Sequence, residues 1–88
     1  MHESSLMQSL MRKIEDIADA NGAARILGVK VWLGALSHFS EEHFRDHFDV
    51  AAKGSRAEGA ELTIELSDDE TDPRAQDVIV EAIEVDDD

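Results

Sequence analysis

The sequence predicts an α+β fold in which two helices pack on one face of a small three-stranded sheet, in the order α-β-α-β-β. Three observations support this prediction: two segments have apolar residues at helical spacing, three have alternating ones, and turn residues separate all five. Each segment carries its apolar side chains mainly on one side, so a helix layer on one sheet face buries them. With 88 residues, the chain is expected to form a single domain over residues 1–88.

The first helix is expected over residues 4–20. Ser5 and Gln8 have the spacing of a capping box at its start, and Asn21-Gly22 supplies residues that tolerate the left-handed conformation of a helix end. Its apolar stripe consists of Met7, Leu10, Met11, Ile14, Ile17 and Ala18. The methionines on this stripe are expected to fill the core rather than to bind copper.

The second helix is expected to follow Ser40, which is a favourable N-cap residue. Phe39 precedes the cap, as in a hydrophobic staple, and Lys53-Gly54 ends the helix. Its inner stripe consists of Phe44, Phe48, Ala51 and Ala52.

The first strand is expected over residues 26–33. Its helix-facing residues are expected to be Leu27, Val29, Val31 and Leu33. The opposite face then carries Lys30 and Trp32. An exposed aromatic side chain on a thin sheet is a candidate contact for a partner protein, so Lys30 and Trp32 form a candidate partner surface.

The other two strands are expected over residues 60–66 and 78–85. In the former, Leu62, Ile64 and Leu66 are expected to face inward. In the latter, the alternation changes phase, which predicts a β-bulge near Glu81-Ala82. An acidic loop at residues 67–76 joins the two strands, and the sequence predicts that they form a hairpin.

Charge and composition exclude several classes of function. The chain has 8 Lys plus Arg against 21 Asp plus Glu, and its net charge of −13 argues against nucleic-acid and anionic-membrane partners. There is no apolar run of membrane-spanning length and no recognisable signal peptide, so a cytoplasmic location is expected. No cysteine is present, which excludes disulfides and thiolate metal sites within these residues.

The first three residues form a candidate metal site. The amine of Met1, the amide nitrogen and imidazole of His2, and the amide nitrogen of Glu3 are four nitrogens that can lie in one plane. Square-planar nitrogen sites suit Ni(II) or Cu(II). The tripeptide by itself is weak evidence, since some residue must follow any initiating methionine.

His43 and His47 form a second candidate metal site. They are four residues apart and therefore lie on the same side of the second helix, with His38 nearby in the sequence. The zincin pattern, with Glu directly after the first His, is absent. Two surface histidines without a metal are the alternative interpretation.

The sequence does not predict an enzyme. It contains no cysteine nucleophile, no serine nucleophile elbow and no glycine-rich phosphate loop. Its carboxylates are spread over several expected surfaces, and no pair is predicted to share a pocket.

Several stretches resemble the HypA/HybF family: residues 1–10, residues 29–37, residues 48–50 followed by 53–54, residues 57–62 and residues 83–85. This family comprises nickel metallochaperones that help to mature NiFe-hydrogenase and, in some organisms, urease. The opening Met-His-Glu, combined with the strand that runs into Gly-Ala-Leu-Ser, is the specific part of the resemblance.

The resemblance implies a nickel-binding accessory protein that binds Ni(II) transiently through Met1, His2 and Glu3. Its expected partners are a nickel-handling GTPase and a nickel-enzyme precursor. The family carries a zinc lobe with two Cys-x-x-Cys pairs between its second and third strands, where this chain has the acidic loop 67–76, so no structural zinc is expected. The alternative is a protein-interaction module that has lost metal delivery. Open sheet edges make a homodimer possible.

Overall fold

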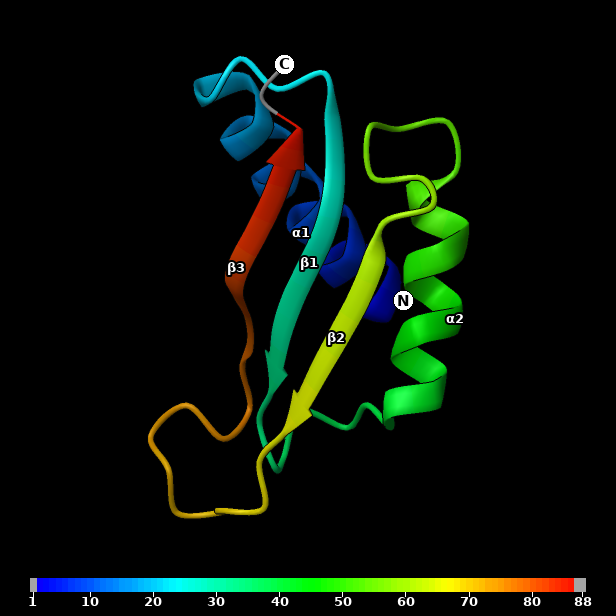
Figure 1. The fold of residues 1–88 in the computed structure, drawn as a ribbon. Helices are drawn as coiled ribbons and strands as arrows, with labels where there is room; N and C mark the ends of the chain where they lie inside the picture. The colour runs from blue at the N-terminus through cyan, green and yellow to red at the C-terminus, as the bar shows by residue number, and fades with distance from the viewer. Residues whose placement is uncertain (1, 87–88) are drawn as a thin grey trace.

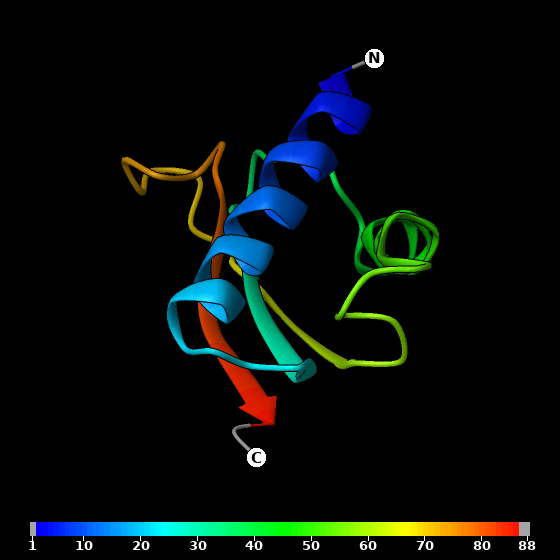
Figure 2. The same ribbon diagram turned by 90° about the horizontal axis from the view of Figure 1, so that it is seen from above.

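The structure, a computed structural model, describes the backbone of residues 2–86 and the side chains of residues 5–86. Its elements are α1 (His2–Ala20), β1 (Arg25–Leu33), α2 (Glu41–Ala52), β2 (Glu61–Leu66) and β3 (Val78–Asp86). Both helices lie on the same side of the sheet (Figures 1 and 2). The predicted α+β class and element order are therefore confirmed.

The core lies between this sheet face and the two helices. The largest side chains buried there are Phe44, Phe48, Ile14, Ile26, Leu33 and Val31. Phe44 and Phe48 come from α2, Ile14 comes from α1, and the remaining three come from β1. The apolar stripes predicted for the two helices thus meet over the central strand.

The sheet has the order β2-β1-β3, with β1 parallel to β2 and antiparallel to β3. The predicted hairpin between β2 and β3 is wrong, since these strands lie on opposite sides of β1 (Figure 1). The reason is visible in β1, where Val31, Trp32 and Leu33 are buried in succession. Such an unbroken buried run belongs to a strand covered on both faces.

Two β-bulges set which side chains face the helices. Lys30 pairs with Ala82 and Val31 with Val80, so Glu81 is the extra residue in β3 and the predicted bulge is confirmed. A second shift leaves Leu27 as the extra residue in β1. Leu27 is therefore 43% exposed, and the prediction that it faces the helices is wrong.

The end of α1 is a Schellman motif. The N–H of Ala23 donates to the carbonyl of Ala18 at 2.9 Å, and Gly22 has a φ of 62°. The predicted stop at Asn21-Gly22 is thereby confirmed. The capping box at Ser5 is wrong, because the helix already begins at His2.

The start of α2 agrees with the sequence prediction. The Ser40 hydroxyl accepts a hydrogen bond from the N–H of His43 at 3.1 Å. The ring of Phe39 packs edge-on against Phe44, with centroids 5.4 Å apart, as the staple predicts. These contacts fix the first turn of α2 and hence the direction of its two histidines.

The segment between β2 and β3 packs onto the open face of the sheet. The guanidinium of Arg74 lies 4.8 Å from the centroid of the Trp32 ring, and Trp32 is only 8% exposed. The expectation of an exposed tryptophan is therefore wrong. Leu66, expected inside, is 54% exposed because it lies at the end of β2, where this segment begins.

Gly34 allows this packing, since a Cβ there would lie 2.2 Å from the carbonyl oxygen of Ala75. We expect Gly34→Ala to displace the segment around Ala75 and to expose Trp32, the only tryptophan. The measurement is a red shift in tryptophan emission. Gly28→Ala is the matched control, because its added Cβ would meet nothing closer than 3.5 Å. Unchanged emission in Gly34→Ala would contradict this packing.

Candidate metal centre

The predicted nickel ligands lie at the start of α1. Met1 is outside the described residues, and only the backbone of His2 and Glu3 is described, within the first turn. The first four N–H groups of an α-helix have no intrahelical acceptor. The amide nitrogens of His2 and Glu3 are thus not needed for the hydrogen bonds of α1.

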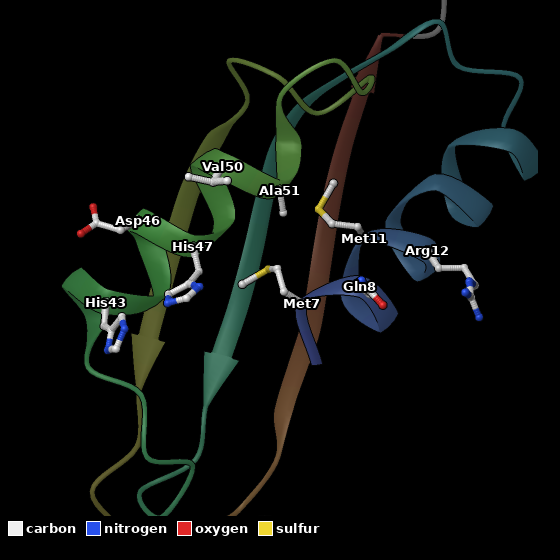
Figure 3. A pocket seen from close by; sticks show the side chains of 9 residues that line it. All are labelled: Met7, Gln8, Met11, Arg12, His43, Asp46, His47, Val50 and Ala51. Atoms are coloured by element: carbon white, nitrogen blue, oxygen red, sulfur yellow. The ribbon is translucent and has the colours of Figure 1, made fainter. Parts of the chain in front are cut away.

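A groove separates the first half of α1 from α2, with a volume of about 870 Å³. Its walls combine thioethers, imidazoles and a few polar groups (Figure 3). They comprise Met7, Gln8, Met11 and Arg12 from α1, with His43, Asp46, His47, Val50 and Ala51 from α2.

The groove brings together the two histidines predicted to share a side of α2. The centroids of the His43 and His47 rings are 4.7 Å apart, with 42° between the ring planes. The His43 ring also lies edge-on to Phe39, with centroids 6.4 Å apart. Within residues 5–86 no group of three or more His, Cys, Asp or Glu side chains is placed to hold a metal ion. The metal-binding role of the pair remains a prediction.

Arg56 holds the end of α1 against the loop that follows α2. Its guanidinium forms ion pairs with Glu15, at 3.1 Å, and with Asp19, and donates to the carbonyl of Ala23 at 3.1 Å. The hydrogen bond to Asp19 raises the pKa of Arg56 above its ordinary value. In addition, Arg45 of α2 donates to the carbonyl of Leu62 in β2 at 2.9 Å. These contacts between distant segments keep the two helices in place beside the groove.

The candidate partner surface has a different character from the one expected. Lys30 is half-exposed and lies 3.8 Å from Glu65 and 3.9 Å from Glu81, on the two neighbouring strands. Trp32 is covered by Arg74, as described above. The exposed part of this surface is thus charged, and its role in partner binding remains a prediction.

The acidic loop 67–76 is ordered by its own side chains. The carboxylate of Asp69 accepts from the N–H of Thr71 at 3.0 Å, and that of Asp72 from the N–H of Arg74 at 2.7 Å. The backbone hydrogen bond from Arg74 lowers the pKa of Asp72. A lowered carboxyl pKa stabilises the fold above the ordinary aspartate value, near 3.9, and this stabilisation is lost as the pH falls through the lowered pKa.

Sequence reasoning missed the methionine-lined wall of the groove and the contact between Arg74 and Trp32. Met7 and Met11 were correctly placed on the packing stripe of α1, but their contribution to a groove shared with the histidines depends on how the helices pack. The only signal in the sequence was that polar residues flank the apolar stripes of both helices, as Gln8 flanks Met7 and His47 flanks Phe48.

A family model described as "Hydrogenase/urease nickel incorporation, metallochaperone, hypA" matches residues 1–74. The chain belongs to the HypA family. The match includes the Met1-His2-Glu3 opening, both helices and the first two strands. The resemblance seen in the sequence is thus confirmed. The family's description is that of a metallochaperone rather than an enzyme, in agreement with the prediction.

The curated relatives of this HypA-family chain are named hydrogenase maturation factors. It is 45% identical over 65 residues to the hydrogenase maturation factor HybF of Salmonella typhimurium, covering 74% of this chain and 58% of the relative. It is 36% identical over 66 residues to the hydrogenase maturation factor HypA of Methanopyrus kandleri, covering 75% and 46%. The chain therefore spans about half the length of the curated relatives it matches.

Two solved structures share the fold. One is the solution structure of the Ni metallochaperone HypA from Helicobacter pylori, with a TM-score of 0.79 and 19% identity, covering 94% of this chain and 96% of the other. The second is a solution structure of HypA protein, with a TM-score of 0.75 and 21% identity, covering 100% and 98%. At these sequence identities the two structures support only the fold of the HypA-family chain and say nothing about its function.

The described helices provide no membrane anchor of the spanning type. Within residues 2–86 no helix is both long enough and apolar enough to cross a bilayer. The 88 residues also contain no cysteine, so they cannot form a Cys₄ zinc site by themselves.

Proposed function

We propose that this HypA-family chain is a nickel-binding accessory protein that delivers Ni(II) during the maturation of a nickel enzyme. The observation that carries the proposal is the family match over residues 1–74, which includes the candidate ligands Met1, His2 and Glu3. The proposed donors are the amine of Met1, the amide nitrogen and imidazole of His2, and the amide nitrogen of Glu3. These four nitrogens suit square-planar Ni(II).

Nickel binding is expected to change the first turn of α1. Consecutive backbone nitrogens reach one ion only when their peptide planes become nearly coplanar, which is not the helical arrangement. The helix should therefore begin after Glu3 when nickel is bound. Among the described side chains of α1, the buried ones begin at Met7, so we expect this local change to leave the core intact. A terminal site of this kind releases its ion one donor at a time, as delivery requires.

Selectivity for nickel is expected to come from partners rather than from the site. Cu(II) binds most nitrogen sites more tightly than Ni(II) does, following the general affinity order. We propose that a nickel-handling GTPase and the precursor of a NiFe-hydrogenase, or of a urease, are the partners, and that delivery takes place in the cytoplasm. The half-exposed Lys30 and its glutamate neighbours form the candidate surface for docking.

One observation favours a second candidate, a protein-interaction module without metal delivery. The 88 residues contain no cysteine, so the loop 67–76 between β2 and β3 cannot supply the two Cys-x-x-Cys pairs that the family resemblance implies at this place. In this alternative the charged sheet face or an open strand edge binds a partner protein or a second copy of the chain. His2 would then be dispensable.

Complementation separates the two candidates. The chain, expressed without an N-terminal tag, is introduced into a bacterium that lacks its own HypA-type maturation factor. We expect restored hydrogenase activity with the wild-type chain and none with His2→Ala, at equal protein levels. Equal restoration by wild type and His2→Ala would favour the interaction module. His38→Asn is the matched control, because asparagine tolerates the positive φ of 68° at that position.

A further inference from the structure

The histidine pair in the groove has a geometry that suits a second ion. His43 and His47 lie one helical turn apart on α2, and their ring centroids are 4.7 Å apart. Ser40 caps the helix and Phe44 and Phe48 anchor it, so the pair is carried on a rigid element rather than on a loop. We propose that His43 and His47 bind a second late first-row divalent ion, Ni(II) in the first instance, through their imidazoles.

The surrounding residues determine how this ion is held. Asp46 also lines the groove, but within residues 5–86 no group of three or more His, Cys, Asp or Glu side chains is placed to hold an ion. The ion therefore keeps water in its remaining positions, as a six-coordinate divalent ion does. Such binding is weaker and more easily reversed than chelation by four protein nitrogens.

The residues that line the groove also favour a divalent metal ion over Cu(I). Met7 projects toward His47 across the groove, and soft thioether ligands favour Cu(I) (Figure 3). However, Met7 is only 4% exposed and belongs to the core. Its sulfur is buried in the core, and imidazoles such as those of His43 and His47 are the usual protein ligands of nickel and zinc.

The second site would lie close to the end of α1 that carries the proposed nickel ligands. Met7, which lines the groove, follows His2 by five residues, or about 7.5 Å along the helix axis. The histidine pair is nevertheless independent of the N-terminal nitrogens, so either site can fail without the other. An ion bound weakly by His43 and His47 would therefore lie near the proposed four-nitrogen site at the start of α1.

The test is Ni(II) titration of the full chain carrying His2→Ala, followed by ¹H–¹⁵N NMR. Six-coordinate Ni(II) is paramagnetic, whereas square-planar Ni(II) is not, so an ion on the pair broadens nearby signals. We expect signals of the groove residues in α2 and in the first half of α1 to broaden first. His43→Gln/His47→Gln, added to the same chain, should abolish the effect and retain the helix, since glutamine is a good helix former.

Other outcomes overturn the proposal. Broadening that persists in His43→Gln/His47→Gln, or that centres on His38 or on residues 67–77, would place the ion elsewhere. No broadening in the His2→Ala chain would mean that the pair does not bind Ni(II).

Silver(I), a probe for Cu(I) sites, should leave the methyl signals of Met7 and Met11 unchanged. A shift of these signals without Ni(II) binding would show a soft-metal site instead. In the wild-type chain the stoichiometry should fall from two to one when the pair is replaced.

Discussion

His2→Ala is expected to weaken nickel binding at the N-terminus by more than about 100-fold. Removing only an outer partner of a metal ligand costs about 10- to 100-fold in affinity, and this change removes a ligand itself. It also opens the chelate ring that links the imidazole to the amine of Met1. The measurement is calorimetric titration with Ni(II) of protein whose chain begins at Met1 without a tag.

The comparison is made in a chain that already carries His43→Gln/His47→Gln, so that one site is observed at a time. His38→Asn should leave the affinity unchanged, because this exposed histidine belongs to neither candidate site. An affinity that is the same with and without His2 would show that nickel binds elsewhere on the molecule.

Phe44→Ala is expected to lower the free energy of unfolding by about 3–5 kcal/mol. Phe44 is fully buried, and its ring packs against Phe39 at the start of α2. The change leaves a cavity between α2 and the sheet. Because small domains have a total stability of about 5–15 kcal/mol, the loss should move the midpoint of urea unfolding substantially.

Val50→Ala on the same helix is the control for this effect. Val50 is 70% exposed, and surface substitutions of this kind usually change stability by less than about 0.5 kcal/mol. If Phe44→Ala and Val50→Ala unfolded at the same urea concentration, the packing of α2 described here would be wrong.

Local patterns were sufficient to predict the elements and most of their boundaries, although α1 begins at His2 rather than near Ser5. Ser40 and Phe39 define the start of α2, Gly22 defines the end of α1, and the phase change in β3 marks the bulge at Glu81. Each of these signals acts over a few residues. They could therefore be interpreted without knowledge of the tertiary contacts.

Strand pairing and the environment of Trp32 could not be predicted in the same way. Alternation shows which residues share a face, but it does not show which strand lies next to which. The unbroken apolar run Val31-Trp32-Leu33, which is buried in the structure, is typical of a central strand. In the sequence analysis it was interpreted as part of an alternating pattern. The cover over Trp32 comes from Arg74, which lies 42 residues further along the chain and on no predicted element.

The two candidate metal sites differ in how far they could be predicted from the sequence alone. Met1, His2 and Glu3 are contiguous, so their proposed site needs no tertiary structure and was found from the sequence and the family resemblance. His43 and His47 were predicted to share a side of α2, and their 4.7 Å separation agrees. That they open onto a groove walled by Met7 and Met11 follows only from the packing of α1 beside α2.

Nickel binding by Met1, His2 and Glu3 is tested most directly by the absorption spectra of the Ni(II)-loaded protein with a free and with an acetylated Met1 amine. In the free protein, we predict that one of the bound Ni(II) ions has the d–d absorption of a square-planar nitrogen site, whereas an ion on the histidine pair does not. Acetylation removes the amine donor, so the same absorption should be absent from the acetylated protein. Identical square-planar spectra from both proteins would contradict nickel binding by Met1, His2 and Glu3.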